Sequence, residues 1–463
     1  MIPFTIGEVA RITGGNLDSV EDPSKLVSGP AVIDSRQAVP GALFAALPGE
    51  RADGHDFARQ ATEAGAALVL ATRQVGVPAV VVSDVPEAMA RLARALIGRL
   101  PDLVIAGITG SAGKTTTKDL AAQLISSLGP TIWPENSFNN EIGHPLTILR
   151  ADAGTRYLIA ELAARGPGHI AALCEVAPPK LGAVLCVGNA HAGEFGSQEQ
   201  IAAAKSELPQ ALPADGAALL NADDPLVAAM ASRTLARVVT FGQSASADIR
   251  AADVELDRLS RPRFTLVTAA GQAPVKLRLA GAHNVSNALA AAGLAAELGM
   301  SIEAIAEGLS RAVALSKWRM EITERPDGVI VINDAYNSSP EAMTAALESL
   351  QVIAAGRRAY AVLGRMAELG SRSAEFHQKA GITAARTGLA GIIAVGEEAA
   401  PILAGAKAEP GFGGELVAVP DDNAAVAALT DRLRPGDVVL VKASRAAGLQ
   451  TVALALTAQE NSP

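Results

Sequence analysis

The hydrophobic and polar positions of the chain predict strands and helices that alternate over most of its length. An apolar run at residues 103–108 predicts a buried strand, and the stretch at residues 115–127 predicts a helix. Further short apolar runs predict strands at residues 157–160, 183–187, 217–220 and 238–241, and then at residues 329–332, 359–363, 391–395, 416–419 and 438–441. Helical stretches separate these runs, and such alternation is typical of a mostly parallel sheet flanked by helices.

The first hundred residues have shorter strand-like runs, which are separated by glycine and proline residues. Strands are predicted at residues 31–33, 42–46, 67–70 and 79–82, and helices at residues 57–64 and 87–97. Thr5 and Glu8 have the spacing of a capping box at the start of a further helix. The G-x-G-x-x-G pattern is absent from this region, which argues against a dinucleotide site of the Rossmann kind.

The length of the chain and the residues that mark breaks in its pattern predict three domains. A chain of 463 residues has room for about three domains of ordinary size. Pro101 and Asp102 mark the first boundary, and the second lies around Ser316. The predicted fold is α/β throughout: a small N-terminal domain over residues 1–100, a central domain with a P-loop-type, mostly parallel sheet over residues 101–315, and a Rossmann-like C-terminal domain over residues 316–463.

Composition and charge narrow the possible partners and the location of the chain. The net charge is −9 and the pI is near 5.3, which argues against a general nucleic-acid binder, because such proteins present a basic surface. The two cysteines, Cys174 and Cys186, fit a reducing compartment. The sequence has no signal-peptide pattern and no apolar run near the ~20 residues of a membrane span. We expect a soluble, cytoplasmic protein without a nucleic-acid partner.

The segment between the strand at residues 103–108 and the following helix predicts a phosphate-binding loop. Backbone N–H groups of such a loop and the positive end of the helix dipole both point toward an anion. Lys114 is placed to reach the outer phosphates of a nucleotide, and the Thr115 hydroxyl is placed to bind Mg²⁺. Because Ile108 occupies the first glycine position of G-x-x-x-x-G-K-[ST], an ordinary strand-to-helix turn remains the alternative. The predicted loop and helix start comprise Gly110, Ser111, Ala112, Gly113, Lys114, Thr115 and Thr116.

Polar residues follow two neighbouring predicted strands, at the sheet edge where ligands collect in folds of this kind. Glu161 follows one strand and His191 follows the next. A carboxylate and an imidazole both suit a divalent cation, so the pair would complete a magnesium site begun by Thr115. The alternatives are a carboxylate that caps a helix and a hydrogen-bonded loop histidine. Lys205 ends a predicted helix that starts at residue 198, and taken alone it is most simply a solvated lysine paired with a glutamate.

Together these motifs resemble those of the Mur ligases, which build the peptide of bacterial cell-wall precursors. The phosphate loop from Thr109 to Thr117 is similar to the variant of that family, including the lack of glycine at position 108. Other similar segments are at residues 139–143, 189–191, 221–225, 281–284, 319–321 and 442–445. The resemblance therefore extends almost from one end of the chain to the other.

Within the family, the chain is most similar to the members that join D-alanyl-D-alanine to UDP-N-acetylmuramoyl-tripeptide. This similarity lies at residues 5–10, 34–36, 40–44 and 334–340. It implies ATP-dependent amide-bond formation through an acyl phosphate, with two Mg²⁺ sites, in a monomeric enzyme. Two related ligases stay as alternatives: folylpolyglutamate synthase, and the member adding the third residue, whose Asp-Asn-Pro-Arg tetrad is absent here. A phosphate-loop switch or a non-catalytic nucleotide-binding scaffold is the alternative from another class.

The resemblance also implies roles for individual residues. The implied catalytic set is Lys114, Glu161, His191 and Lys205; the implied metal ligands are Thr115, Glu161, His191 and Lys205, the lysine after modification to a carbamate. Beyond the loop, the implied ATP contacts are Asn284, Arg319 and Asp334. The implied contacts to the UDP substrate are Ser35, Arg36, Asp53, His55, Asn139 and Asn140, although the first four belong to clusters that by themselves are typical of turns. The implied dipeptide side is Tyr336, Asn337, Lys442, Ser444 and Arg445.

Five positions depart from the pattern of the family. Leu162, Ala163 and Arg165 stand where methionine, glycine and asparagine are expected, and Asn189 and Gln450 stand where proline and glutamate are usual. These positions face the substrate or lie behind the catalytic residues, and the predicted catalytic residues themselves are unchanged. Because the implied ATP contacts are divided between two domains, we also expect the C-terminal domain to close on ATP and the incoming dipeptide.

Overall fold

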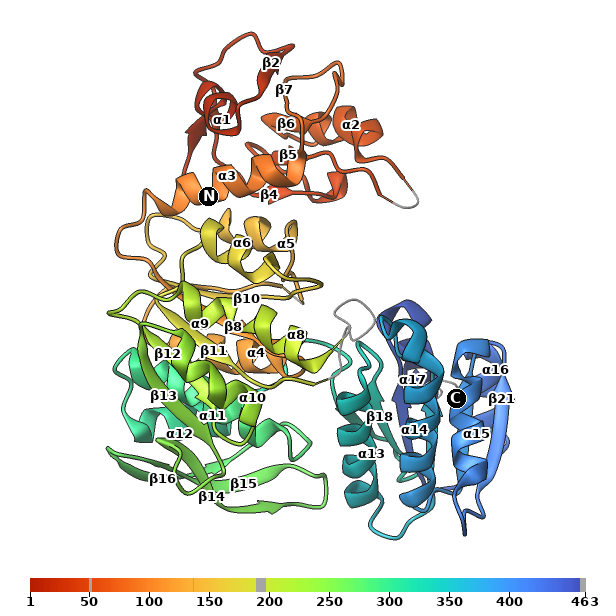
Figure 1. The fold of residues 1–463 in the computed structure, drawn as a ribbon. Helices are drawn as coiled ribbons and strands as arrows, with labels where there is room; N and C mark the ends of the chain where they lie inside the picture. The colour runs from red at the N-terminus through yellow and green to blue at the C-terminus, as the bar shows by residue number, and fades with distance from the viewer. Residues whose placement is uncertain (50–51, 136, 189–196, 459–463) are drawn as a thin grey trace.

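The computed structural model describes residues 1–49, 52–135, 137–188 and 197–458 of the chain. Three β-sheets of five, nine and six strands follow one another along the sequence, and each is covered by helices. Figure 1 shows the N-terminal sheet above the central one, with the C-terminal sheet beside it. The structure thus confirms the predicted α/β class with parallel-rich sheets. The predicted boundaries at residues 100 and 315 remain predictions.

The N-terminal sheet has the strand order β2-β7-β6-β5-β4. Its strands are β2 (Asn16–Asp18), β4 (Ala31–Val32), β5 (Leu43–Ala45), β6 (Leu68–Ala71) and β7 (Ala79–Val81), and β1 (Phe4–Thr5) pairs separately with β3 (Leu26–Val27). The helices are α1 (Ile6–Thr13), α2 (Ala58–Glu63) and α3 (Val85–Ile97). The predicted capping box is confirmed: the Glu8 N–H donates to Thr5 Oγ1 at 3.1 Å, and the Thr5 N–H donates to Glu8 Oε2 at 2.8 Å.

The central sheet has the strand order β16-β15-β14-β13-β12-β11-β8-β10-β9. The strands are β8 (Val104–Thr109), β9 (Thr131–Ile132), β10 (Tyr157–Glu161), β11 (Leu181–Val184), β12 (Ala217–Asn221), β13 (Arg237–Gly242), β14 (Ile249–Leu256), β15 (Pro262–Thr268) and β16 (Gly271–Lys276). Strands β8 to β14 run parallel, whereas β15 and β16 add an antiparallel edge that the sequence did not predict. Buried and exposed positions largely alternate in β15, as expected for a strand with one solvated face.

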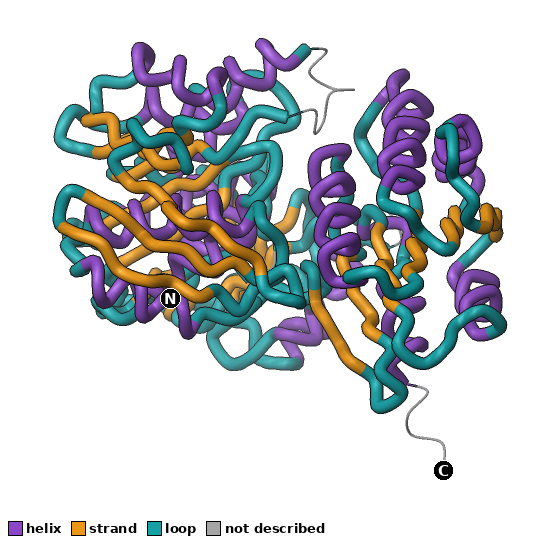
Figure 2. The backbone as a smooth tube through the Cα atoms, turned by 90° about the horizontal axis from the view of Figure 1, so that it is seen from below, coloured by secondary structure: helices purple, strands orange, loops and turns teal. Residues whose placement is uncertain are grey.

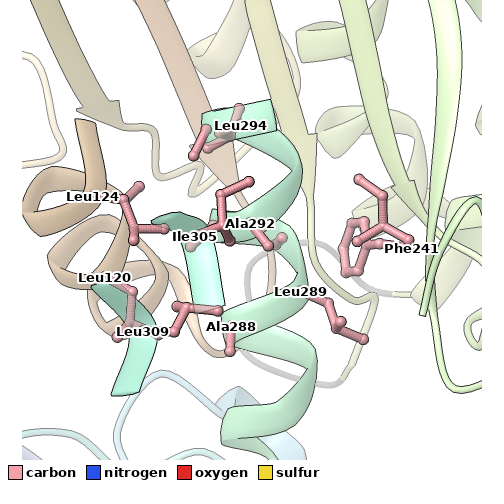
Figure 3. Close-up of a cluster of buried hydrophobic side chains, with 14 of the residues drawn as sticks. Leu120, Leu124, Phe241, Ala288, Leu289, Ala292, Leu294, Ile305 and Leu309 are labelled. Carbon is pink, nitrogen blue, oxygen red and sulfur yellow. The ribbon is translucent and has the colours of Figure 1, made fainter. Parts of the chain in front are cut away.

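The described helices of the central part include α4, which packs against two of the others. They are α4 (Lys114–Ile125), α5 (Gly143–Ile148), α6 (His169–Val176), α8 (Gln198–Lys205), α9 (Glu207–Ala211), α10 (Pro225–Ala228), α11 (Asn284–Glu297) and α12 (Ile302–Arg311). Leu120 and Leu124 of α4 pack against the alanine face of α11, with Ile305 of α12 in the same buried cluster (Figure 3). Fully burying a leucine side chain contributes about 1.5–3 kcal/mol, so this packing fixes the direction of α4 firmly.

The C-terminal sheet has the strand order β17-β18-β22-β19-β20-β21, and only β17 is antiparallel within it. Its strands are β17 (Glu321–Glu324), β18 (Ile330–Asp334), β19 (Ala359–Leu363), β20 (Gly391–Val395), β21 (Glu415–Val419) and β22 (Val438–Lys442). Helices α13 (Pro340–Ala354), α14 (Ser373–Arg386) and α15 (Ala400–Ala408) cover one face, and α16 (Asp422–Thr430) and α17 (Gln450–Ala458) cover the other. Seen from below, this layered unit again lies beside the central sheet (Figure 2).

In the described part of the chain, none of the helices combines the length and the apolar character needed to cross a membrane.

Candidate functional site

The predicted phosphate loop joins the carboxyl end of β8 to the start of α4. Gly113 is the residue before the helix, with a φ of +82°, and Lys114 donates from Nζ to the Gly110 carbonyl at 2.6 Å. The loop is tied to the segment after β11, because the Ser111 N–H donates to the Cys186 carbonyl at 2.9 Å and the Gly188 N–H donates to Ser111 Oγ at 2.9 Å. These bonds hold the first N–H groups of α4 at the edge of the sheet, where they are able to bind an anion.

The loop leaves no room for a side chain at Gly113. A Cβ built there would lie 2.2 Å from Asn287 Oδ1 of α11. Asn287 also accepts from Thr117 Oγ1 at 3.3 Å and donates from Nδ2 to Asn284 Oδ1 at 2.8 Å. The glycine therefore permits both the left-handed backbone and the close approach of α11.

A cavity of about 880 Å³ opens in front of the loop, and residues of both the central and the C-terminal parts of the chain line it. Most of the predicted site residues line it: Ser111, Ala112, Gly113, Lys114, Thr115, Thr116, Asn139, Asn140, Glu161, Asn284, Arg319, Asp334, Tyr336, Asn337 and Lys442. His191 and Asn189 lie outside the described residues. The cavity is thus built from two parts of the chain about 200 residues apart in sequence, as Thr115 and Arg319 illustrate.

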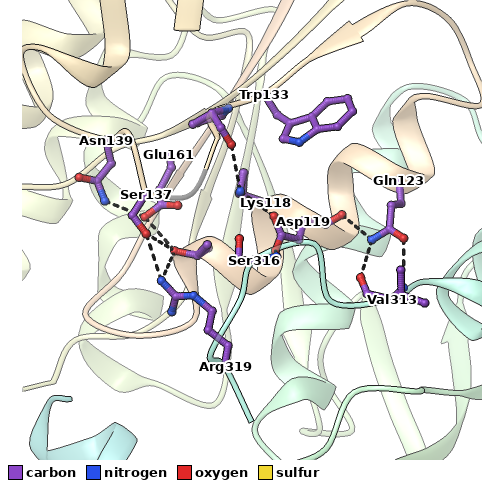
Figure 4. A network of polar contacts seen from close by, with 12 residues as sticks. Lys118, Asp119, Gln123, Trp133, Ser137, Asn139, Glu161, Val313, Ser316 and Arg319 are labelled. Carbon is purple, nitrogen blue, oxygen red and sulfur yellow. Dashed lines mark hydrogen bonds and ion pairs between the residues drawn. The ribbon is translucent and has the colours of Figure 1, made fainter. Parts of the chain in front are cut away.

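Glu161, at the end of β10, is directed toward Thr115. Thr115 Oγ1 donates to Glu161 Oε1 at 3.2 Å, and Asn139 Nδ2 donates to the same oxygen at 2.7 Å (Figure 4). The Glu161 side chain is 1% exposed, and its Oε2 has no hydrogen-bond partner among the described residues. A buried carboxylate oxygen without a partner is costly, so Glu161 and Thr115 fit a cation at this point. The described residues contain no group of three or more His, Cys, Asp or Glu side chains that would hold a metal by themselves.

Arg319 reaches this centre from the C-terminal side. Its Nη2 donates to Thr115 Oγ1 at 2.9 Å and to Ser137 Oγ at 3.0 Å, and its guanidinium lies 4.4 Å from the centre of the Tyr336 ring. The flanking residues Trp318 and Met320 have φ values of +59° and +51°. Such backbone is strained for residues with side chains, and it is typical of sites where a side chain must be held in one direction.

Two lysines near the loop are buried, and burial changes their protonation. The pKa of Lys114 is lowered by burial, although the charge of Glu161 opposes this shift. The pKa of Lys205 is lowered to about 7, first by burial and then by the charge of Lys114. Lys205 is 4% exposed, so the alternative of a solvated surface lysine is wrong. At neutral pH a large part of the Lys205 amine is uncharged and nucleophilic.

The predicted residues at the C-terminal side make three separate sets of contacts. Lys442 Nζ lies 2.5 Å from Asp334 Oδ2 and donates to the Asn337 carbonyl at 3.0 Å. Ser444 Oγ accepts from the Ala367 N–H at 2.8 Å, and the Arg445 guanidinium is 5.4 Å from the centre of the Tyr336 ring. Lys442 is 1% exposed, so its charge fixes the loop after β18 and is neutralised by Asp334.

Comparison with known proteins agrees with this geometry. Family models described as "Mur ligase family, catalytic domain", "Mur ligase middle domain" and "Mur ligase, glutamate ligase domain" match residues 31–110, 108–295 and 318–445. This chain belongs to the Mur ligase family. The result confirms the resemblance noted in the sequence, and with it an enzyme of the ATP-dependent ligase class.

Several relatives align with this Mur ligase over almost its whole length. UDP-N-acetylmuramoyl-tripeptide--D-alanyl-D-alanine ligase of Mycobacterium tuberculosis is 48% identical, over 99% of both chains. MurF from Acinetobacter baumannii has a similar structure, with a TM-score of 0.87 and 29% identity, over 98% of this chain and 99% of that one. MurF from Thermotoga maritima, solved in complex with ADP, has a TM-score of 0.79 and 30% identity, over 94% and 98% of the two chains.

The N-terminal candidates of this Mur ligase do not line the cavity. Asp34 and Asp53 each cap a short 3₁₀ helix, and Arg36 pairs with Asp34 at 2.6 Å. His55 is held between Asp53 and Thr72: Nδ1 lies 2.6 Å from Asp53 Oδ1, and Nε2 accepts from the Thr72 N–H at 3.0 Å. Ser35 Oγ donates to Gln60 Oε1 at 3.1 Å. In this structure Asp34 and Asp53 stabilise turns, whereas Ser35 and His55 bind residues farther along the chain. The contact of the predicted residues with a UDP substrate stays a prediction.

Four further predicted residues and two departures can also be placed. Gly110, Lys205, Ser444 and Arg445 are not among the residues that line the cavity. Ala163 lines the cavity, and its N–H donates to the Asn139 carbonyl at 3.1 Å. Gln450 begins α17, with a buried Oε1 that has no partner among the described residues.

Sequence reasoning missed two residues of the site, Ser137 and Asn287. Ser137 accepts from Arg319, and Asn287 holds Asn284. Asn287 follows Asn284 by three positions on a helix, so their contact was predictable from helix geometry. Ser137 had no comparable signal, because its partners come from distant parts of the chain.

Gly113→Ala tests the loop geometry, and Gly168→Ala is its matched control. Both glycines have nearly the same φ, +82° and +84°, but nothing lies within 4 Å of a Cβ at Gly168. Gly168→Ala should therefore lose about 1–2 kcal/mol of unfolding free energy, the cost of the left-handed backbone. Gly113→Ala should lose about 1–3 kcal/mol more from overpacking against Asn287, and its ATP affinity should fall at least about tenfold. Urea unfolding and equilibrium ATP binding measure both effects; equal losses for the two variants would contradict the account.

Proposed function

We propose that this chain is the ATP-dependent ligase that joins D-alanyl-D-alanine to UDP-N-acetylmuramoyl-tripeptide. The observation that carries the proposal is the cavity in which Lys114, Glu161 and Arg319 converge from two parts of the chain. The full-length similarity to ligases with this name, at 48% identity, supports the choice of substrates. We further propose that the enzyme acts in the cytoplasm, where ATP is available, and as a monomer.

The proposed reaction activates a carboxylate that an amine cannot attack directly. The terminal carboxylate of the tripeptide attacks the γ-phosphorus of ATP, which forms an acyl phosphate and releases ADP. The amine of D-alanyl-D-alanine then attacks the acyl carbon, the C–O bond to phosphate breaks, and the amine gives up a proton. One ATP is thus converted to ADP and inorganic phosphate for each amide bond formed. Two anions must meet in the first step, so positioning and charge neutralisation are the main tasks of the protein.

The residues of this chain are suited to those tasks. Lys114 and the N-terminus of α4 would neutralise the β- and γ-phosphates, and Arg319 would approach the γ-phosphate from the opposite wall. Asn284 and Asp334 would contact the nucleotide on the two sides of the cavity. We propose that Thr115 and Glu161, with His191, hold Mg²⁺, which would neutralise phosphate charge in the transition state.

Lys205 has the properties needed to become a carbamate. A neutral amine adds to CO₂ and loses a proton, and the product is an anion that suits a second Mg²⁺. The lowered pKa of Lys205, near 7, supplies the neutral amine at physiological pH. We therefore propose two Mg²⁺ sites, the second of them completed by carbamylated Lys205.

The remaining predicted residues fit the three substrates by position. Asn139 and Asn140 line the same cavity as Asp334 and would face the sugar and peptide. Tyr336, Asn337, Lys442, Ser444 and Arg445 would form the dipeptide side. Residues 1–100, with Ser35, Arg36, Asp53 and His55, would bind the uridine nucleotide, residues 101–315 would bind ATP, and residues 316–463 would close on ATP and the dipeptide.

An assay with four separate amines tests the proposed function. Phosphate release is measured with ATP, Mg²⁺ and UDP-N-acetylmuramoyl-tripeptide after addition of D-alanyl-D-alanine, diaminopimelate, lysine or glutamate. Only D-alanyl-D-alanine should stimulate release, and mass spectrometry should show the pentapeptide product. In parallel assays, release stimulated by diaminopimelate or lysine with UDP-N-acetylmuramoyl-dipeptide as the acceptor would favour the ligase that adds the third residue, and release stimulated by glutamate with a folate as the acceptor would favour folylpolyglutamate synthase. ATP binding with no covalent product would favour a scaffold.

Incubation with ¹³C-bicarbonate tests the modification of Lys205. A carbamate carbon signal should appear in the wild-type protein and be absent from Lys205→Arg. Because the neutral amine predominates only above about pH 7, the signal at a fixed CO₂ pressure should grow as the pH rises from 6 to 8. Lys205→Ala should lose most of the ligase activity, whereas an active Lys205→Ala enzyme that is insensitive to bicarbonate would contradict the proposal.

A further inference from the structure

Three residues on one face of α4 contact the segment that leads into the C-terminal sheet. Thr115, Asp119 and Gln123 are spaced by four positions, so their side chains project from the same side of the helix. Their partners are Arg319, Ser316 and Val313, which are spaced by three positions in the opposite direction. The segment therefore runs antiparallel to α4 along a ladder of three contacts (Figure 4).

Gln123 makes the contact farthest from the phosphate loop. Its Nε2 donates to the Val313 carbonyl at 2.9 Å, and its Oε1 accepts from the Val313 N–H at 3.0 Å. Both polar groups of the carboxamide thus bind the backbone of one residue, as a neighbouring strand would. This pair of bonds fixes the position of Val313 along α4 regardless of the side chain at position 313.

Asp119 makes the middle contact, and it is buried. Its Oδ2 accepts from the Ser316 N–H at 3.0 Å, and its Oδ1 lies 2.6 Å from Lys118 Nζ. Lys118 Nζ also donates to the Pro134 carbonyl at 3.1 Å. The side chains of Lys118 and Asp119 are 1% and 3% exposed, so the charge of Asp119 is compensated within the protein and its direction is fixed.

The segment has little else to hold it. Residues 312–316 form no helix or strand, and Val313 and Leu315 are each 43% exposed. In the part of the chain that the structure describes, the hydrogen bonds of residues 313–317 are those with Gln123 and Asp119. The third contact differs from the other two because it joins two side chains: Arg319 there binds the Thr115 hydroxyl at the phosphate loop.

We propose that Gln123 and Asp119 are positioning residues that keep this segment in register on α4, so that Arg319 is delivered to the phosphates of the bound nucleotide. The inner contact between Arg319 and Thr115 opens when the nucleotide and its cation enter, while the two outer contacts persist. Helix α4, which begins at the phosphate loop, therefore also positions Arg319, which reaches the loop from the C-terminal side. This inference rests on the proposed ligase function.

A double-mutant cycle tests whether Gln123 acts through Arg319. Gln123→Met removes both bonds to Val313 while keeping a side chain of similar length. In the wild-type background kcat should fall about tenfold, and the equilibrium affinity for ADP should change less than about twofold, because Gln123 is not among the residues that line the cavity. In an Arg319→Ala background the same substitution should change kcat less than about twofold. Equal losses in the two backgrounds would overturn the proposal.

Two controls separate positioning from a general structural effect. Ser126→Ala, at the exposed C-terminal end of α4, should leave kcat unchanged. Gln123→Glu should lower kcat at least as much as Gln123→Met, because its second oxygen would face the Val313 carbonyl. If both Gln123 variants lowered kcat only in proportion to a lower melting temperature, or left it unchanged, the positioning role would be wrong.

Hydrogen exchange tests the contacts between α4 and residues 313–316 in a way that does not depend on catalytic turnover. The N–H groups of Val313 and Ser316 are the donors to α4, so Gln123→Met should accelerate exchange at both residues if the contacts act together. Acceleration at Val313 alone would overturn the proposal that the two contacts share one register. A wild-type enzyme that releases no phosphate with any amine would instead reject the proposed function, and the exchange result would still decide the ladder.

Discussion

The close contact between Gly113 and Asn287 is the constraint on which the site depends. A phosphate loop must expose its N–H groups, and at the same time the helix after it must pack tightly enough to keep its direction. The left-handed Gly113 and the missing Cβ meet both conditions, because α11 approaches the loop to within a distance that a side chain would block. Asn287 in turn holds the side chain of Asn284, which lines the cavity, through a hydrogen bond of 2.8 Å.

Helix α4 connects this constraint with the rest of the molecule. Its leucines lie in the core shared with α11 and α12, its first residues form the phosphate site, and another face of the helix holds the segment that carries Arg319. Burial of Lys114 beside the loop lowers its pKa, which means that its positive charge is poorly solvated. Such a charge favours the binding of anions, so the phosphates of ATP would relieve a cost that the folded protein already carries.

The sequence predicted the parts of this arrangement that depend on local pattern. The strand and helix on either side of the phosphate loop were placed within one or two residues, because an apolar run and a glycine-rich loop mark their ends. Glu161 was found because it follows a buried strand. The antiparallel edge β14–β16 was missed, since its half-exposed strands lack a continuous apolar run. Ser137 and the Asp119–Ser316 contact depend on how distant segments pack, which no local pattern encodes.

Transfer of an oxygen isotope tests the central claim most directly. The tripeptide substrate is labelled with ¹⁸O in its terminal carboxylate and is converted with ATP and D-alanyl-D-alanine. If the carboxylate attacks the γ-phosphorus in this cavity, one ¹⁸O atom should appear in inorganic phosphate for each amide bond formed, and Lys114→Met should abolish both products together. Phosphate without ¹⁸O, formed alongside the amide product, would contradict the account.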